Sequence, residues 1–247
     1  MRKEAVPVPD AVGFIGRHPH RHSVGERKPP VGDQRKQSYV GRTSAPAHSV
    51  VKRGFDVIMA TLGLLVLSPG LIAIALAIKL TSRGPILFRQ RRYGLNNKIF
   101  VIYKFRTMYV DEADETGVEQ TRYSDRRVTP VGRVLRRFSL DEFPQLFNAA
   151  RGDMSLVGPR PHVPGMLAAG VPYEILVPNY FERHRMKPGI TGLAQARGLR
   201  GSTADVELAK ARIDLDLKYI QNWSLTLDLR IIIETVWREF LKAGNGI

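Results

Sequence analysis

The longest apolar stretch of the chain runs from residue 57 to residue 78, VIMATLGLLVLSPGLIAIALAI, and contains no charged side chain. A helix of these 22 residues would be about 33 Å long, which is enough to cross the hydrocarbon core of a bilayer. Ser68 and Pro69 stand in its middle, and Pro69 has no backbone N–H to donate within a helix. The pattern predicts a membrane helix that breaks there, with the Ser68 hydroxyl as a candidate donor for a freed carbonyl.

Basic side chains flank the apolar stretch on both sides, Lys52 and Arg53 before it and Lys79 and Arg83 after it. A helix that spans a membrane carries its positive charge mainly on the cytoplasmic side. Positive charge at both ends instead favours a re-entrant helix-break-helix hairpin over residues 50–82, which dips into the inner leaflet and returns to the same face. The alternative is a buried pair of core helices in a soluble protein.

The rest of the chain predicts a mixed α/β fold that is mainly helical, over residues 83–247. Two runs rich in β-branched and aromatic residues, PILFRQRRYG and KIFVIYKFRTM, flank Gly94-Leu95-Asn96-Asn97 and predict a hairpin. Residues 204–223 and 225–242 have helical periodicity. In the second helix one face holds Leu229, Ile232, Ile233, Val236, Trp237 and Phe240. Packing into a core is the default for such a stripe, and a place on the membrane interface is the alternative.

The first 49 residues have no apolar periodicity and are rich in Pro, Gly, Ser and Arg. They have too little apolar surface to bury, so we predict a disordered basic arm over residues 1–49. The arm contains no apolar core of a signal peptide. His18, His20 and His22 alternate within it, but histidines in a flexible polar segment are more often solvated than bound to metal.

The chain of 247 residues has a formal net charge of +15 and no cysteine. The absence of cysteine excludes disulfides, thiolate metal sites and cysteine nucleophiles. The positive charge predicts anionic partners, which could be nucleic acid, acidic lipid or phosphorylated substrates. Residues 57–110 contain no acid, and eight basic residues follow the apolar stretch there: Lys79, Arg83, Arg89, Arg91, Arg92, Lys98, Lys104 and Arg106. Cations beside a membrane attract anionic headgroups and would also hold a lipid phosphate or a nucleotide diphosphate.

A nucleic-acid-binding protein would explain the positive charge. It would not explain an uncharged stretch broken by Ser-Pro, and the sequence contains no reading motif such as a zinc finger. We therefore expect no nucleic acid among the partners. Extraction separates the two classes, because salt releases a nucleic-acid binder whereas a membrane protein needs detergent.

Two adjacent acids, Asp141 and Glu142, stand in the stretch RRFSLDEFPQLFN. Ser139 and Glu142 have the spacing of a capping box, so one interpretation is a helix start with acids in its first turn. The functional interpretation is that one carboxylate attacks phosphorus while its neighbour holds Mg²⁺ and nearby arginines neutralise phosphate. Downstream, Pro159 and Pro161 fix Arg160 between two rigid residues, either to present its guanidinium or as a surface turn. The residues alone leave these interpretations open.

Six motifs occur in one order: KRGFD, the Ser-Pro break, YKFRTM, SLDEFPQLFN, DMSLVGPRP and KPGITGLAQ. With them, residues 50–241 resemble the bacterial sugar transferase family, the monotopic polyprenyl-phosphate sugar-1-phosphate transferases. The resemblance is to the small type that initiates exopolysaccharide synthesis. It implies transfer of hexose-1-phosphate from a UDP-hexose to undecaprenyl phosphate with release of UMP. It also implies the cytoplasmic face of the bacterial inner membrane.

The resemblance implies roles for single residues as well. Asp141 would be the nucleophile that forms a covalent phosphosugar-enzyme intermediate, and Glu142 would bind Mg²⁺. Arg136 would bind phosphate and Arg160 the nucleotide. Ser68 and Pro69 would make the membrane helix re-entrant. Among the cations of the acid-free stretch we expect Lys104 and Arg106, both in YKFRTM, to bind substrate.

The predicted organisation is therefore a basic arm (1–49), a membrane hairpin (50–82) and a catalytic domain on the membrane surface (83–247). The predicted partners are UDP-hexose, undecaprenyl phosphate and anionic lipids of the inner membrane, and a homo-oligomer stays open. A non-catalytic membrane scaffold of a polysaccharide assembly complex is the alternative. The intact pair of acids argues against such a scaffold.

Overall fold

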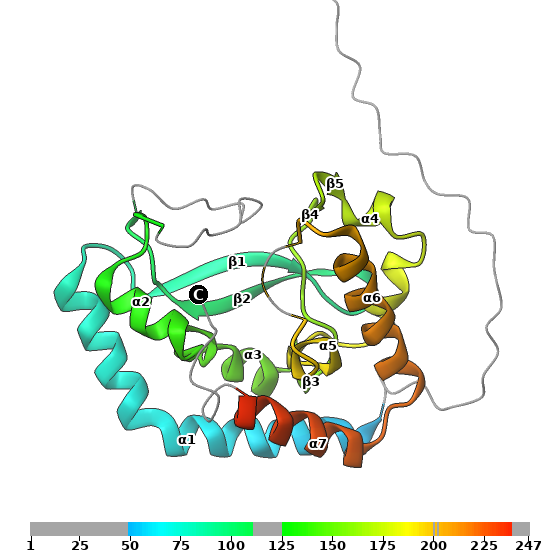
Figure 1. The fold of residues 1–247 in the computed structure, drawn as a ribbon. Helices are drawn as coiled ribbons and strands as arrows, with labels where there is room; N and C mark the ends of the chain where they lie inside the picture. The colour runs from blue at the N-terminus through cyan, green and yellow to red at the C-terminus, as the bar shows by residue number, and fades with distance from the viewer. Residues whose placement is uncertain (1–48, 111–124, 200, 202, 239–247) are drawn as a thin grey trace, which may run out of the picture. The chain divides into compact units, whose positions relative to one another are not determined.

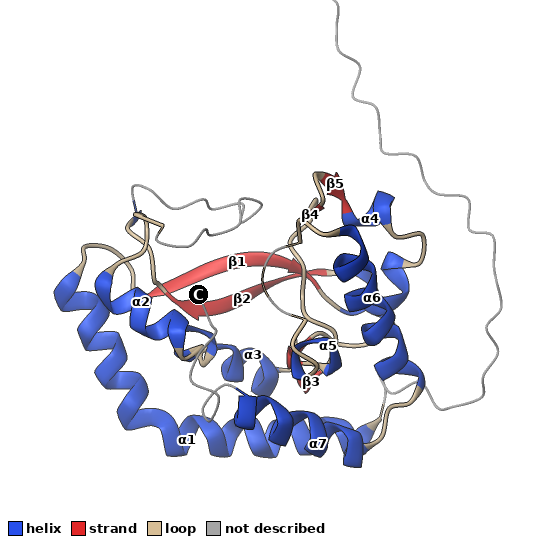
Figure 2. Ribbon diagram, viewed as in Figure 1, coloured by secondary structure: helices blue, strands red, loops and turns tan. Residues whose placement is uncertain are grey.

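The computed structural model of the protein describes residues 49–110, 125–199, 201 and 203–238, all within one structural unit, Arg42–Ile247. The predicted arm lies outside the described residues up to residue 48, as do its three histidines. Helices predominate over short strands in the described residues (Figures 1 and 2), which agrees with the predicted mixed α/β, mainly helical fold.

Helix α1 (Val50–Thr81) contains the whole apolar stretch and continues through Pro69. Figure 1 shows that α1 bends in its middle rather than stopping there. Pro69 cannot donate to the carbonyl of Leu65 four residues back, and the Ser68 hydroxyl donates to that carbonyl instead, over 2.8 Å. The structure therefore replaces the expected interruption by a bend within one helix. The predicted role of Ser68 as donor is confirmed.

Most apolar side chains of α1 are exposed. In its most apolar window only 6% of the residues are buried. Those exposed over at least half of their surface are Val50, Val51, Ile58, Leu62, Leu65, Val66, Ile72, Leu76 and Leu80. By length and composition α1 is the one helix in the described part of the chain that could cross a membrane. The alternative of a buried core helix pair is wrong, because such helices would have covered these side chains.

The predicted hairpin is confirmed. Strands β1 (Leu87–Tyr93) and β2 (Ile99–Phe105) are antiparallel, with Leu87 opposite Phe105 and Tyr93 opposite Ile99. The connection uses Asn96 at φ 53°, in the left-handed region that asparagine adopts more readily than most residues. The hairpin places four of the eight basic residues, Arg89, Arg91, Arg92 and Lys104, on two paired strands.

Two short helices stand on either side of the acidic pair. Helix α2 (Pro130–Arg137) begins with proline, which suits the first helical position. Helix α3 (Gln145–Arg151) packs against α1. Arg53 of α1 donates to the carbonyls of Ala149 and Ala150 over 2.7 Å each, which places a cation at the C-terminal end of α3. The segment between α2 and α3 is thereby fixed to the long apolar helix.

The second half of the chain forms small elements around two longer helices. Its 3₁₀ and α-helical turns are α4 (Tyr173–Leu176), η5 (Tyr180–Arg185) and α5 (Leu193–Ala196), whereas η2 (Leu95–Asn97) belongs to the connection between β1 and β2. The strands are β3 (Ser155–Val157), β4 (Leu167–Ala168), β5 (Val171–Pro172) and β6 (Gly189–Thr191). Strands β3 and β6 pair in parallel, and β4 pairs with β5 antiparallel. The two predicted C-terminal helices are α6 (Val206–Gln221) and α7 (Leu225–Val236).

A buried ion pair joins the start of α1 to α7. Lys52 Nζ lies 2.6 Å from Oδ2 of Asp228, which is fully buried. Asp228 also accepts from the Tyr219 hydroxyl over 2.6 Å and from the indole N–H of Trp223 over 3.1 Å. Because every polar partner is satisfied, the pair fixes α7 alongside the first part of α1 (Figure 1).

The apolar stripe on α7 is mostly exposed, and of its described members only Ile232 is partly buried against a core cluster. Leu229, Ile233, Val236 and Trp237 are 45%, 67%, 51% and 58% exposed, whereas Ile231 on the other face is fully buried. The default expectation of core packing is wrong for these four residues. The stripe instead adds to the exposed apolar surface of α1, as a helix lying on a membrane interface would. Phe240 lies outside the described residues.

Candidate active site

The acidic pair lies on the 3₁₀ turn η4 (Leu140–Glu142) between α2 and α3. Ser139 precedes the turn at φ 54° and its side chain does not cap it, so the predicted capping box is wrong. The turn is closed by backbone bonds, from the amide of Glu142 to the Ser139 carbonyl and from Phe143 to Leu140, 3.3 Å each. Both acids still stand in the first turn, and both are half-buried.

Glu142 is held by two cations from separate parts of the chain. Lys104 Nζ, at the end of β2, lies 2.7 Å from Oε1 of Glu142. Arg160, just after β3, donates from Nη2 to Oε1 over 2.6 Å and from Nη1 to Oε2 over 3.3 Å. Burial acts to raise the pKa of Glu142, but Arg160 and Lys104 together lower it well below its usual value. Glu142 is therefore ionised at neutral pH.

Asp141 has the opposite shift. Burial raises its pKa above the usual value, and the neighbouring Glu142 charge adds to this, while Lys104, Arg136 and Arg160 lower it only in part. Two adjacent carboxyl groups whose pKa values are pushed apart are suited to different chemical roles. The more basic carboxylate is the better nucleophile of the two. The ion-paired carboxylate, Glu142, is suited to holding cations near the substrate phosphates.

Arg136 stands in the last turn of α2 and its charge acts on Asp141. Its Nε donates to Oγ1 of Thr107 over 2.8 Å. Thr107 follows β2 and its carbonyl accepts from the amide of Thr129, so the hairpin end and the start of α2 are joined there. The structure thus brings Arg136 to the acidic pair, and sequence reasoning missed Thr107, which lies in the YKFRTM motif.

Arg106 does not join the site. Its guanidinium donates to the carbonyl of Arg83 and, over 3.0 Å, to that of Ser82, where α1 ends. Lys104 and Arg106 stand two residues apart, and the amide of Arg106 still donates to the carbonyl of Ile86 over 2.8 Å, but the two side chains bind different groups. The geometry therefore gives Arg106 a role in closing the loop after α1 and does not support the expected contact with substrate.

A further arginine, Arg92 on β1, contacts the segment that carries Arg160. Its Nη1 donates to the carbonyl of Pro161 over 3.1 Å, and its Nη2 donates to the side chain of Gln90. Burial and the nearby Arg160 charge, opposed by Glu142, lower the pKa of Arg92 to about 10. The sequence singled out Arg92 only as one of eight cations. Its place on the face of β1 that turns toward Arg160 could not be read without the register.

The acids fit Mg²⁺ in a particular way. Within the described ranges there is no group of three or more His, Asp or Glu side chains that could cage a metal. Mg²⁺ is commonly held by one or two carboxylates together with phosphate oxygens and water. Asp141 and Glu142 are two such carboxylates, and Glu142 is ionised, as a ligand must be. The residues therefore fit a metal that is bound jointly with substrate phosphates, in competition with Lys104 and Arg160 for Glu142.

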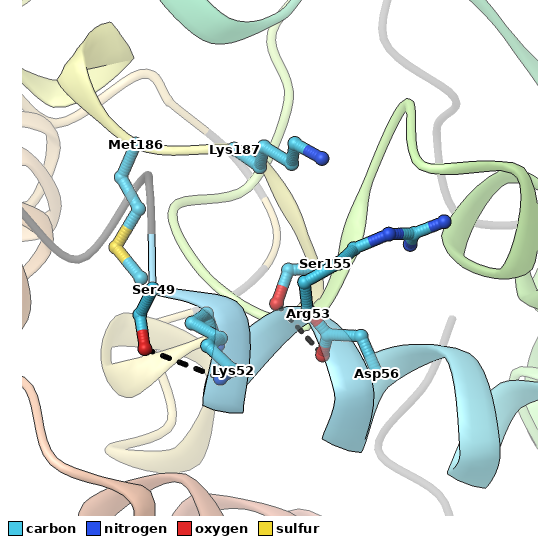
Figure 3. A pocket seen from close by; sticks show the side chains of 7 residues that line it. All are labelled: Ser49, Lys52, Arg53, Asp56, Ser155, Met186 and Lys187. Carbon is cyan, nitrogen blue, oxygen red and sulfur yellow. Dashed lines mark hydrogen bonds between the residues drawn. The ribbon is translucent and has the colours of Figure 1, made fainter.

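A small pocket at the start of α1 is separate from the acidic pair, and most of its charged side chains are bound to other parts of the protein (Figure 3). It is lined by Ser49, Lys52, Arg53, Asp56, Ser155, Met186 and Lys187. Lys52 is paired with Asp228, Arg53 with carbonyls of α3, and Asp56 accepts from the Ser155 hydroxyl over 3.0 Å. Because the charged side chains of this pocket mostly join helices and strands to one another, we do not propose it as a substrate-binding site.

The site and the fold together define a class of protein. A basic carboxylate beside an ionised one, among cations and on a scaffold with a long exposed apolar helix, is suited to phosphate transfer at a membrane. Residues 47–242 match the sequence model of a family described as bacterial sugar transferase. The chain belongs to this family, as its motifs indicated.

Several curated proteins are similar in sequence to this chain. An exopolysaccharide production protein of Rhizobium leguminosarum bv. phaseoli is 52% identical over 197 residues, which cover 80% of this chain and 98% of the relative. A UDP-glucose:undecaprenyl-phosphate glucose-1-phosphate transferase of Caulobacter vibrioides is 52% identical over 185 residues, covering 75% and 68%. The Escherichia coli (strain K12) protein of the same name is 48% identical over 193 residues, covering 78% of this chain and 41% of the relative. The chain thus matches the whole of one relative and about two fifths of another.

Proposed function

We propose that the protein transfers glucose-1-phosphate from UDP-glucose to undecaprenyl phosphate and releases UMP, a first membrane step in exopolysaccharide synthesis. The names of the relatives support the reaction and the choice of glucose. The observation that carries the proposal is the pair of carboxyl groups with opposite pKa shifts, Asp141 raised and Glu142 lowered, among Lys104, Arg136 and Arg160. That arrangement supplies a nucleophile and positive charge for a diphosphate at one place.

The reaction would proceed through two displacements at one phosphorus. An oxygen of Asp141 bonds to the phosphorus that carries glucose, and the bond from that phosphorus to the bridging oxygen breaks, so that UMP leaves with the electron pair. A phosphate oxygen of undecaprenyl phosphate then attacks the same phosphorus, and the Asp141 carboxylate leaves. A covalent intermediate lets a water-borne donor and a lipid-borne acceptor use the site in turn.

The cations around the acids would bind the charges of the substrates. Arg136 is suited to the phosphate that is transferred, since its charge acts on Asp141. Arg160 is partly exposed, with 43% of its side chain accessible, and can reach the nucleotide while it contacts Glu142. Lys104 neutralises Glu142 or the diphosphate. Mg²⁺ held at Glu142 would add charge neutralisation to the phosphate oxygens.

The membrane would be the cytoplasmic leaflet of the bacterial inner membrane. The exposed apolar side chains of α1 and of the α7 stripe support insertion and interfacial contact. A re-entrant path of α1, bent where Pro69 lies, would keep the catalytic domain on the UDP-sugar side with Asp141 near the lipid headgroups. Exposed cations such as Arg89 and Arg91 would attract anionic lipids.

The released nucleotide tests the proposal. Purified protein in nanodiscs is incubated with undecaprenyl phosphate and, separately, UDP-glucose, UDP-galactose and UDP-N-acetylglucosamine. We expect UMP, with UDP-glucose as the preferred donor. Release of UDP would indicate a glycosyl transfer instead, and release of no nucleotide from any donor would favour the non-catalytic scaffold. Preference for another donor would overturn the choice of glucose but not the reaction.

A further inference from the structure

The segment Pro159-Arg160-Pro161 has an unusual balance of hydrogen-bonding groups. Neither proline has a backbone N–H, so the segment offers three carbonyls and a single donor. All three carbonyls are nevertheless bound. Pro159 accepts from the amide of Gly189 over 3.0 Å, Arg160 from Nη2 of Arg183 over 2.6 Å, and Pro161 from Nη1 of Arg92 over 3.1 Å. Two guanidinium groups therefore hold the backbone from which the Arg160 side chain projects toward Glu142.

Arg183 is itself fixed by a buried acid. It lies on η5 with its side chain 1% exposed, and its Nε and Nη2 donate to Oδ2 of Asp216 over 2.9 and 2.6 Å. Asp216 lies on α6 and its side chain is 4% exposed. The same Nη2 contacts both the Asp216 carboxylate and the Arg160 carbonyl. Asp216 thus fixes the guanidinium of Arg183, and that guanidinium holds the Arg160 carbonyl, while Arg92 and the Gly189 amide hold the prolines on either side.

A buried ion pair of this kind needs a reason beyond stability. Desolvation of two charges offsets most of their attraction, so apolar side chains of similar volume would stabilise the fold about as well. A planar guanidinium differs from them in giving two acceptors a fixed mutual direction. Here the acceptors are a carboxylate on α6 and the carbonyl of Arg160, whose side chain contacts one of the two acids.

We infer that Arg183 and Asp216 are positioning residues of the active site: they aim the Arg160 guanidinium at Glu142 through the Arg160 backbone. The inference rests on the proposed function for its kinetic consequence, although not for its geometry. Neither residue faces substrate, because both are almost fully buried. Their effect on catalysis should therefore pass through Arg160 alone.

A double-mutant cycle tests this dependence. In otherwise wild-type protein, Asp216→Asn should lower kcat/KM for UDP-glucose by about tenfold, because a small misplacement of a charged group is costly in a transition state. In an Arg160→Ala background the same change should alter kcat/KM by less than about twofold, since the aimed group is absent. Equal effects in both backgrounds would overturn the inference, because a purely structural role acts regardless of Arg160.

Two further variants guard against trivial explanations. Arg183→Lys keeps the buried charge but not the planar fork of the guanidinium. It should therefore fold even if Asp216→Asn is too unstable to assay, and its effect on kcat/KM should show the same dependence on Arg160. Ile213→Val removes a methylene from a fully buried residue of α6 without contacting Arg160, and it should leave kcat/KM unchanged. A loss with Ile213→Val equal to that of the other two would mean that α6 stability is what matters, which contradicts the inference.

Hydrogen exchange separates failure of the inference from failure of the proposed function. Without any substrate, Asp216→Asn or Arg183→Lys should speed amide exchange in residues 158–163 and leave residues 140–151 unchanged. Unchanged exchange in residues 158–163 would overturn the inference even in a fully active enzyme. If the wild-type protein released no UMP, the proposed function would fail, and the exchange pattern would still decide whether the pair holds the Arg160 backbone.

Discussion

Arg160 contacts both carboxylate oxygens of Glu142, with Nη2 2.6 Å from Oε1 and Nη1 3.3 Å from Oε2, although 18 residues separate them in the chain. Lys104 contacts the same Oε1 from another strand. Burial, together with the neighbouring Glu142 charge, raises the pKa of Asp141 even though Lys104, Arg136 and Arg160 lower it in part. The contact therefore divides the acidic pair into an ion-paired carboxylate and a more basic one. The division of labour between them can be tested residue by residue.

Acid should inactivate the enzyme through Asp141. The nucleophile must be ionised, and burial raises its pKa above that of an ordinary aspartate, so kcat/KM for UDP-glucose should fall as pH drops through this raised value. Glu142 should not set this limb, because its pKa lies well below the usual range. The check is a profile of kcat/KM against pH. A profile that stays flat down to the pKa of an ordinary aspartate would contradict the assignment.

Removal of metal should abolish transfer. EDTA should stop UMP release and added Mg²⁺ should restore it, because the two carboxylates and the diphosphate are all negatively charged and a divalent cation offsets their repulsion. Glu142→Gln should raise the Mg²⁺ concentration for half-maximal activity by about tenfold or more, the range seen when metal-site partners are lost. Asp153→Asn is the matched control, because Asp153 forms an ion pair with Arg151 and does not belong to the acidic pair Asp141 and Glu142. An unchanged Mg²⁺ requirement in Glu142→Gln would remove it as a ligand.

Arginine should be required at position 160 rather than any cation. Arg160→Lys keeps the charge but cannot contact both oxygens of Glu142 at once, so we expect about a tenfold loss of kcat/KM, and about a hundredfold loss for Arg160→Ala. Thermal melting should be similar for all three proteins, since the side chain is partly exposed. If Arg160→Lys retained wild-type kcat/KM, the forked contact would have no role in catalysis.

The path of α1 can be tested by labelling, since the chain contains no cysteine. Single cysteines are introduced as Val50→Cys and Arg83→Cys, one at each end of the helix. With a re-entrant helix both should react with an impermeant maleimide from the cytoplasmic side. Adding Pro69→Ala restores a helical N–H and removes the bend, so one of the two should then react from the opposite side. Labelling of the two ends from opposite sides with Pro69 in place would show a spanning helix.

Local patterns predicted local structure well. The hairpin around Gly94-Leu95-Asn96-Asn97 and the helices α6 and α7 followed from periodicity, because a strand and a helix impose their own spacing on apolar residues. Proline was read as a stop in α1, where it produced a bend. The reason is the single hydrogen bond from Ser68 to Leu65, which lets the helix continue. The apolar stripe of α7 was identified from the sequence, but the default expectation that it packs into the core was wrong for four of its residues, because periodicity cannot say whether a face is covered.

The site was predicted in part. The motifs identified Asp141, Glu142, Lys104 and Arg160, which the structure brings together, because each stands in a short stretch of distinctive chemistry. Arg106 has the same side-chain chemistry as a phosphate-binding residue, but its guanidinium is bound to the carbonyls of Ser82 and Arg83, which the sequence could not show. Arg92, Arg183 and Asp216 could not be found from sequence. Their partners are distant in the chain, and the sequence alone does not distinguish a buried arginine from an exposed one.

The most direct test of the account is to find the phosphosugar on Asp141. The protein is incubated without undecaprenyl phosphate but with UDP-glucose carrying ³²P in the phosphate next to glucose, then digested with trypsin and analysed by mass spectrometry. The account predicts hexose phosphate on the peptide of residues 138–151, with UMP released in equal amount. The label should leave when undecaprenyl phosphate is added, and Asp141→Asn should carry none. An enzyme that turns over with no label on the protein, or with label on another residue, would contradict it.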